Sequence, residues 1–209
     1  METNLRITDI PSMGAQAIGP KLKAYAQRVK DGDAIVELGV WLGAGTAWMA
    51  EGVKTSGADV HIHAYDRFDA SKSERVKAAK QGWDIKGDTR PKVKSALKSL
   101  GLIPYVTLYK GPICSTPWSG QTIGLQVIDA CKRAGSFLKA IEMYSPSWEA
   151  GYTVLVLMDY WFFKYRKDEG LKFQYNWMQE RLDSFSELDM HMSDGSPSSA
   201  AFLYTGGVV

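Results

Sequence analysis

One stretch near the N-terminus decides the fold of this chain: Val-Glu-Leu-Gly-Val-Trp-Leu-Gly-Ala-Gly-Thr, residues 36–46. Its first half ends a nearly continuous apolar run, 34–40, which is typical of a strand buried on both faces in a parallel sheet. The glycines that follow allow a sharp turn and a close approach of the backbone to a ligand. Residues 43–54 have the pattern of a helix, whose N-terminus would point at that ligand.

Strands and helices alternate along the rest of the chain. Beside 34–40, strands are predicted at residues 60–65, 105–109, 123–128, 152–158, 187–192 and 200–204. Beside 43–54, helices are predicted from Ile18 to Val29, from Asp88 or Thr89 to Leu100, over 136–144 and over 173–182. The last two strands flank Asp194-Gly195-Ser196-Pro197, which has the composition of a hairpin turn. This order predicts an α/β fold, a doubly wound and mostly parallel seven-stranded sheet with a closing antiparallel hairpin.

Length and charge set the domain organisation. The 209 residues carry 25 Lys and Arg against 23 Asp and Glu, and 45% of them are hydrophobic. A chain of this size forms one core, so we expect a single domain over 1–209. Residues 1–32 would be an N-terminal helical segment packed on it, and the polar residues 67–90 a lid or substrate loop. The near balance of charge argues against a nucleic-acid partner.

The sequence also predicts the compartment. Two cysteines, Cys114 and Cys131, form no disulfide framework in a chain of this length. The first twenty residues lack the basic and apolar regions of a signal peptide. The most apolar stretch, 154–163, is too short to span a membrane and contains Asp159. We therefore expect a cytoplasmic protein that has no membrane partner.

The spacing of the glycines separates two kinds of nucleotide site. A dinucleotide fingerprint is G-x-G-x-x-G, whereas this chain has G-x-x-x-G-x-G, with Trp48 where the last glycine should stand. A pyrophosphate clamp is therefore disfavoured. A glycine-rich turn of some other α/β protein remains the simplest alternative.

The stretch 36–46 resembles the first motif of class I S-adenosylmethionine-dependent methyltransferases, E-x-G-x-x-x-G-x-[ST]. The resemblance implies S-adenosylmethionine as the cofactor. It assigns cofactor binding to the motif residues Glu37, Gly39, Gly43, Gly45 and Thr46. In that family an acidic residue at the end of the second strand binds the ribose hydroxyls, and Asp66 stands at this place.

Two further strand ends resemble a subgroup of that family. Ile128-Asp129-Ala130-Cys131-Lys132 and Met158-Asp159-Tyr160 are similar to the catechol and caffeoyl-coenzyme A type and to the macrocin-type sugar O-methyltransferases. The resemblance implies that Asp129 and Asp159 hold Mg²⁺, whose preferred ligands are oxygens. It also implies that Lys132 acts as general base, with Asp129 as its partner in catalysis.

The chain departs from the subgroup's pattern at several positions. Tyr160 replaces the usual Asn, Cys131 replaces a carboxylate or aromatic, and Lys132 stands where sugar enzymes often have His. Lys110-Gly111-Pro112-Ile113 lacks the acidic residue often found after the third strand. Two alternatives therefore stay open. Asp129 would instead contact the cofactor amine or cap the next helix, and Lys132 would be a solvated lysine at a helix start.

These observations lead to one main functional hypothesis and two alternatives. The main hypothesis is methyl transfer from S-adenosylmethionine to a hydroxyl of a small molecule, a sugar or a phenol, with or without Mg²⁺. The alternatives are a cofactor-binding but catalytically silent scaffold or partner subunit, and a methyltransferase that acts on RNA or protein. The expected partners are a small-molecule acceptor and, because enzymes of this type are often dimers, a second copy of the chain.

Overall fold

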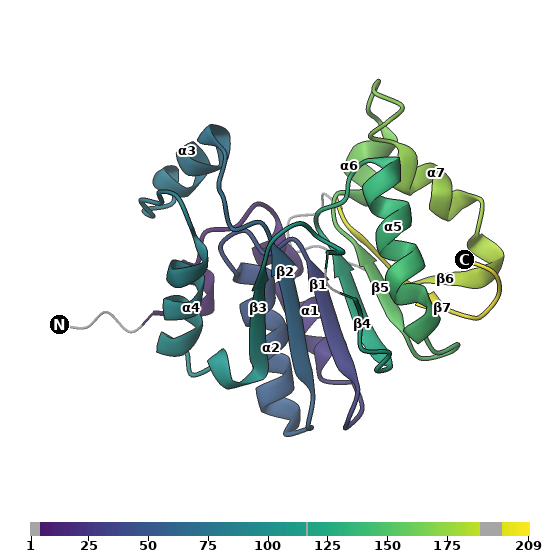
Figure 1. Cartoon of the computed structure of the whole chain (residues 1–209), viewed down its shortest axis with the longest axis horizontal. Coiled ribbons are helices and arrows are strands. Elements are labelled where there is room, and N and C mark those ends of the chain that lie inside the picture. Colours follow the sequence, from purple (N-terminus) through teal and green to yellow (C-terminus); the bar gives the residue numbers. More distant parts are fainter. Residues whose placement is uncertain (1–4, 116, 189–197) are drawn as a thin grey trace.

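The computed structural model describes residues 5–115, 117–188 and 198–209. They form a seven-stranded sheet in the order β3-β2-β1-β4-β5-β7-β6 (Figure 1). The strands are β1 (Ala34–Leu38), β2 (His61–Asp66), β3 (Val106–Lys110), β4 (Ile123–Ile128), β5 (Val154–Leu157), β6 (Phe185–Leu188) and β7 (Ala200–Tyr204). Strands β1 to β5 are parallel, and β7 is antiparallel to both β5 and β6. This confirms the predicted fold class. The predicted turn at 194–197 lies outside the described residues.

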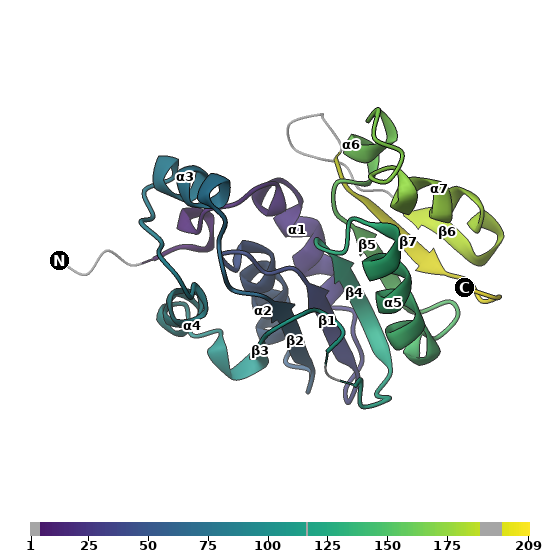
Figure 2. The ribbon, with the colours of Figure 1, turned by 45° about the horizontal axis from the view of Figure 1, so that its top comes forward.

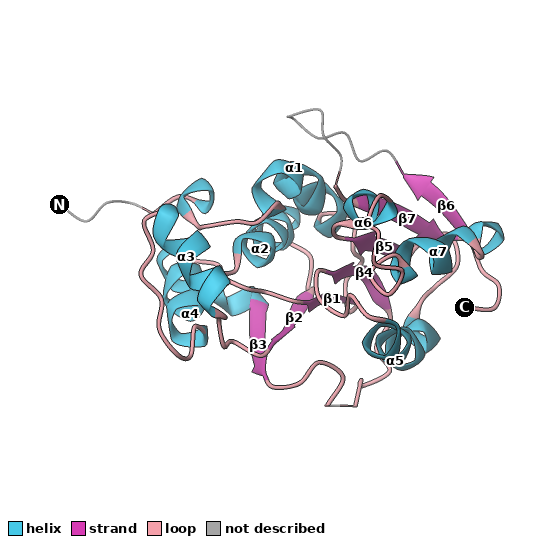
Figure 3. Ribbon diagram, turned by 90° about the horizontal axis from the view of Figure 1, so that it is seen from above, coloured by secondary structure: helices cyan, strands magenta, loops and turns pink. Residues whose placement is uncertain are grey.

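Helices cover both faces of the sheet. They are α1 (Ala15–Ala26), α2 (Ala44–Ser56), α3 (Lys72–Lys80), α4 (Arg90–Ser99), α5 (Ala134–Tyr144), α6 (Tyr160–Lys164) and α7 (Phe173–Gln179). Short 3-10 turns are found at Ile7–Asp9, Ile103–Tyr105, Ser145–Ser147 and Leu182–Ser184. Seen from above, α1 and α2 lie on one face and α5 on the other (Figure 3). No helix in the described part of the chain is long and apolar enough to cross a membrane.

The point at which strand order reverses lies between β1 and β4. The chain runs from β1 outward to β2 and β3 and then returns to β4 on the other side of β1. All five residues of β1 are buried, as expected for a central parallel strand. The ends of the two strands are in register, with Leu38 opposite Ile128. Ligands of such sheets bind beyond the carboxyl ends of the strands at this reversal.

Helix α1 is held against α2 by glycines at their contact. A Cβ atom added to Gly52 would lie 2.5 Å from the Lys23 carbonyl oxygen, so only glycine allows this approach. The indole ring of Trp48 lies against Gly19 in the same way, and its Nε1 donates a hydrogen bond of 2.8 Å to Gln16 Oε1. The residue that breaks the dinucleotide fingerprint is therefore a packing residue for the N-terminal helix.

The polar segment 67–90, predicted as a lid or substrate loop, contains helix α3. Ser71 and Glu74 form a capping box at its start, a local signal that stabilises a helix N-terminus. At its other end Gln81 accepts a hydrogen bond from the Ser12 N–H (2.9 Å) and donates one to the Ser12 carbonyl (3.2 Å). The chain that leads into α1 thus passes beside α3 (Figure 2).

The helix after β5 was not predicted, and helix α7 is shorter than predicted. Helix α6 begins directly after Asp159, which adopts a left-handed φ of 65°. The residues of this helix, Tyr-Trp-Phe-Phe-Lys, are so apolar that their pattern does not distinguish a helix from a continued strand. Helix α7 ends at Gln179, and Leu182 lies in the following 3-10 turn.

The contact between α1 and α2 can be tested with two glycine substitutions. We expect Gly52→Ala to lower the free energy of unfolding by about 1–3 kcal/mol, because the added methyl group must displace the backbone of α1. The matched control is Gly135→Ala in α5, where nothing lies within 4 Å of the added Cβ. That change should raise stability by about 0.4–1 kcal/mol through the unfolded state. Urea titration of both variants measures the difference, and equal effects would contradict the close packing of α1 on α2.

Candidate active site

The loop between β1 and α2 turns at two glycines with positive φ. Gly39 has φ of 101° and Gly43 has φ of 87°, a region that L-residues with a side chain rarely adopt. A Cβ atom on Gly39 would lie 2.9 Å from the backbone nitrogen of Ala130, which follows β4. The loop therefore passes very close to the chain after β4, and Gly43 is the N-cap of α2.

Asp66, at the end of β2, holds this loop in place. Its Oδ2 accepts hydrogen bonds from the backbone N–H groups of Val40 (2.8 Å) and Trp41 (2.9 Å). Its Oδ1 accepts one from Phe68 N–H (2.6 Å). Such bonds to a carboxylate are stronger than those between neutral groups. The sequence predicted that Asp66 binds the ribose hydroxyls. In the structure its carboxylate also has a structural role, because it holds the glycine loop against β2.

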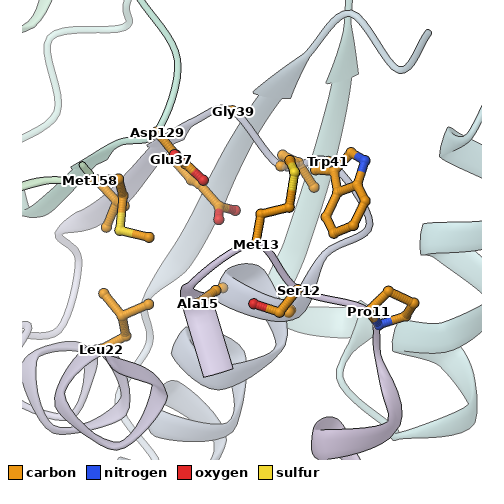
Figure 4. A pocket seen from close by; sticks show the side chains of 14 residues that line it. Pro11, Ser12, Met13, Ala15, Leu22, Glu37, Gly39, Trp41, Asp129 and Met158 are labelled. Carbon is orange, nitrogen blue, oxygen red and sulfur yellow. The ribbon is translucent and has the colours of Figure 1, made fainter. Parts of the chain in front are cut away.

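A pocket opens beyond the ends of β1 and β4 (Figure 4). It is lined by Pro11, Ser12, Met13, Ala15, Leu22, Glu37, Gly39, Val40, Trp41, Ala44, Gly45, Val127, Asp129 and Met158. Of the residues predicted to bind the cofactor, Glu37, Gly39, Gly45 and Asp129 belong to this lining. Gly43, Thr46 and Asp66 lie outside it and shape the loop and the helix that border it.

Among the described residues, the lining carries two acidic side chains and no basic one. Figure 4 shows the Glu37 carboxyl directed into the pocket, near Asp129. Glu37 is only 3% exposed and accepts a hydrogen bond from the Thr46 hydroxyl. Burial raises the pKa of Glu37 to about 8, and the charges of Asp129 and Asp66 act in the same direction. Partial burial also raises the pKa of Asp129 to about 6, although Lys132 opposes that shift.

Lys132 stands between the two aspartates that follow β4 and β5. Its Nζ lies 3.3 Å from Asp129 Oδ1 and 3.4 Å from Asp159 Oδ2. The same Nζ donates a hydrogen bond of 2.9 Å to the Met158 carbonyl oxygen. The structure thus brings together the three residues for which the sequence predicted catalytic or metal-binding roles. Asp129 alone of the three lines the pocket.

The histidine pair on β2 makes contacts inside the sheet. His61 Nε2 lies 2.7 Å from the Thr107 hydroxyl, and His63 Nδ1 lies 3.1 Å from the Tyr109 hydroxyl. Burial lowers the pKa of His63 to about 4. No group of three or more His, Cys, Asp or Glu within the described residues could hold a metal ion. His191 lies outside that part of the chain.

Comparison with known proteins assigns the family. A family model described as a methyltransferase domain matches residues 36–160, which is more than half of the chain. The chain belongs to the class I S-adenosylmethionine-dependent methyltransferases. This methyltransferase therefore uses S-adenosylmethionine, as the motif at residues 37–46 predicted. No curated protein sequence gives a significant match.

Solved structures confirm the methyltransferase fold. Cofactor-bound Rv0187 from MTB is 17% identical, with a TM-score of 0.62 over 95% of this chain and 84% of its own. The O-methyltransferase NovP is 16% identical, with a TM-score of 0.65 over 90% and 79% of the two chains. An rRNA methylase from Streptococcus thermophilus is 14% identical, with a TM-score of 0.54 over 93% and 100%. At these identities the likeness establishes the fold alone.

The pocket of this methyltransferase fits its cofactor. S-adenosylmethionine carries a sulfonium and an ammonium group, and the acidic lining complements both positive charges. The indole Nε1 of Trp41 is buried and, among the described residues, has no hydrogen-bond partner, so it can donate to a ligand oxygen or nitrogen. Trp41 also has a positive φ of 48°, a strained conformation of the kind found at ligand sites. Glu37, Asp129 and the Trp41 indole would hold the polar parts of the cofactor.

The donor set between β4 and β5 does not fit Mg²⁺. This ion prefers six oxygen ligands at about 2.0–2.1 Å, whereas this position offers two carboxylates and a lysine. The Lys132 ammonium already occupies the space between those carboxylates and neutralises part of their charge. Tyr160, the neighbour of Asp159, is fully buried with its hydroxyl bonded to Gln179, so it supplies no ligand there.

One part of the lining could not be found from the motifs. Pro11, Ser12, Met13 and Ala15 come from the chain before and at the start of α1. They reach the pocket because α1 packs on α2. Gln81 also holds this segment through hydrogen bonds with the N–H and the carbonyl oxygen of Ser12. Residues 11–15 have no composition that signals a ligand site, and the contact with Gln81 spans 69 positions.

We expect the affinity for S-adenosylmethionine to rise between about pH 6 and pH 8. The carboxyl of Glu37 is largely protonated below its pKa of about 8. A cation beside it favours the ionised form, so binding releases a proton and becomes tighter as pH rises. Titration calorimetry in buffers of different ionisation enthalpy measures that proton. Glu37→Gln should remove the proton release and flatten the pH profile, and identical profiles for both proteins would contradict this role of Glu37.

Proposed function

We propose that this protein transfers the methyl group of S-adenosylmethionine to a hydroxyl oxygen of a small molecule. The observation that carries the proposal is the position of Asp129. Its carboxylate lines the cofactor pocket and also belongs to the group formed with Lys132 and Asp159. It therefore borders both the cofactor side and the acceptor side of the site. The name of NovP, an O-methyltransferase, supports the same type of acceptor atom.

Methyl transfer to a hydroxyl requires a base that takes up the hydroxyl proton. In the transfer, the acceptor oxygen forms a bond to the methyl carbon while the bond from that carbon to sulfur breaks. S-adenosylhomocysteine leaves as a neutral thioether, and the hydroxyl proton must go to a base. We assign this role to the Asp129 carboxylate, which faces the pocket. A base within hydrogen-bond reach contributes about 10²- to 10⁴-fold in rate, and alignment of the two reactants contributes further.

The surface after β5 suits a ring-shaped acceptor. A hollow there is lined by Phe162, Phe163, Tyr165, Arg166, Lys167, Asp168 and Leu171. Phe162 is 46% exposed, with Arg166 over its ring, and Tyr165 is 78% exposed, so the hollow presents aromatic surface to solvent. Phe163 connects this hollow to the site, because its ring centroid lies 5.6 Å from Lys132 Nζ. Aromatic faces of this kind pack against phenol or sugar rings.

The charge of the protein favours a small acceptor over RNA. The formal net charge is +2, and neutralisation of many RNA phosphates requires a strong basic excess. Arg133, close to the site, is paired with Asp168 at 3.1 Å. A small-molecule hydroxyl therefore remains the acceptor that these observations support best.

The Asp129→Asn variant tests the proposed function. We expect kcat for methyl transfer to fall by at least about 100-fold, because the amide cannot take the proton. The dissociation constant of S-adenosylhomocysteine should change by less than about tenfold, since the amide keeps the shape of the pocket. The assay follows labelled methyl groups onto a panel of phenols and sugars.

Controls distinguish the alternatives. Lys98→Met, an exposed change on α4, should leave both quantities as in the wild type. Tight cofactor binding with no transfer to any acceptor would favour a silent scaffold. Labelling of RNA, with binding that weakens steeply as salt rises, would overturn the proposal in favour of an RNA methyltransferase.

A further inference from the structure

The position between Asp129 and Asp159 contains a cation that belongs to the chain. Lys132 Nζ is within 3.4 Å of an oxygen of each carboxylate, and the Lys132 side chain is only 20% exposed. The resemblance places a divalent ion between these two aspartates. The described residues thus present the same pair of carboxylates around a lysine ammonium.

Three oxygen atoms of the chain surround the Lys132 nitrogen. An ammonium group has three N–H donors and no acceptor. Lys132 Nζ donates hydrogen bonds to the Met158 carbonyl oxygen (2.9 Å) and to Asp129 Oδ1 (3.3 Å), and it forms an ion pair with Asp159 Oδ2 at 3.4 Å. The Phe163 ring lies on another side at 5.6 Å, within the range of a cation–π contact. The chain itself therefore supplies three oxygen partners for this nitrogen.

The backbone on both sides is shaped to make this contact. Cys131 and Asp159 have left-handed φ values of 57° and 65°, a region that Asp adopts readily and Cys seldom does. The turn at Cys131 lies three residues after the end of β4 and precedes Lys132, and the turn at Asp159 follows β5. Gln174 of α7 donates a hydrogen bond of 3.1 Å to the Cys131 carbonyl and so braces the first turn. Two left-handed turns meet at the lysine, which indicates that its position is specified by the fold.

We propose that Lys132 replaces the divalent cation of this site, so that the protein works without a bound metal. This inference rests on the proposed function, because its consequence for the acceptor holds only if the protein methylates a hydroxyl. In this role Lys132 is a positioning residue, because it holds both carboxylates and leaves the other oxygen of Asp129 for the acceptor. A metal ion held by Asp129 and Asp159 would polarise oxygens of the acceptor, whereas Lys132 Nζ is already surrounded by three oxygens of the chain. The acceptor therefore needs one hydroxyl and gains nothing from an adjacent pair.

Manganese binding tests the inference without any acceptor. Mn²⁺ is the probe, and electron paramagnetic resonance measures the free ion during titration. We expect wild-type protein to show no Mn²⁺ site tighter than millimolar. Lys132→Met keeps much of the side-chain volume and removes the charge, so the exposed pair of carboxylates should bind Mn²⁺ at least tenfold more tightly. Adding Asp159→Asn to that variant should remove the gain, and Lys98→Met should behave as the wild type.

Two results would overturn the inference. The first is a stoichiometric, micromolar Mn²⁺ site in the wild-type protein that Asp159→Asn abolishes, and this result needs no variant of Lys132 to fold. The second is a folded Lys132→Met protein, verified by circular dichroism and S-adenosylhomocysteine binding, that gains no Mn²⁺ affinity. Failure of the wild type to bind S-adenosylhomocysteine would instead count against the proposed function. These experiments therefore distinguish a failure of this inference from a failure of the proposed function.

An activity measurement tests the consequence for the acceptor. Once an acceptor is found, excess chelator should change the rate of methyl transfer by less than twofold. A phenol with one hydroxyl should be methylated as well as its analogue with two adjacent hydroxyls. A rate that falls at least tenfold in chelator and returns with Mg²⁺ would overturn the inference.

Discussion

The hydrogen bonds that Asp66 accepts from the glycine loop are the constraint on which the site depends. The loop must leave β1, pass within contact distance of the chain after β4, and start α2. Gly39 allows that path, but it also makes the loop free to adopt many others. The carboxylate of Asp66 accepts the N–H groups of Val40 and Trp41 and so selects one conformation. The pocket beneath the loop has its shape because β1 and β2 are joined at this point.

The site contains two groups of charged residues. On the cofactor side, Glu37 and Asp129 line a pocket that has no basic residue among those the structure describes, and burial raises the pKa of Glu37 to about 8. On the acceptor side, Lys132 balances Asp129 and Asp159. Asp129 belongs to both groups, so a change in either charge acts on the other. This coupling explains how a methyltransferase of this shape could dispense with a metal ion while it keeps both aspartates.

Sequence patterns predicted the fold well because the strands of this chain are buried and regular. The glycine motif and the residues that end β2, β4 and β5 also pointed to the site. Patterns missed what depends on distant contacts, such as the hold of Gln81 on Ser12 and the lining by Met13. They placed Lys132 beside the aspartates but not between them, since that depends on the left-handed turn at Cys131. The helix after β5 was missed because its aromatic residues have no helical periodicity.

A crystal structure of the complex with S-adenosylhomocysteine would test this account most directly. We expect the ligand in the pocket between β1 and β4, with its sulfur beside Gly39 and its amine near Glu37 or Asp129. The hydrogen bonds from Val40 and Trp41 to Asp66 should persist, and Trp41 Nε1 should gain a partner. A ligand bound elsewhere on the protein, or a glycine loop released from Asp66 to admit it, would contradict the account.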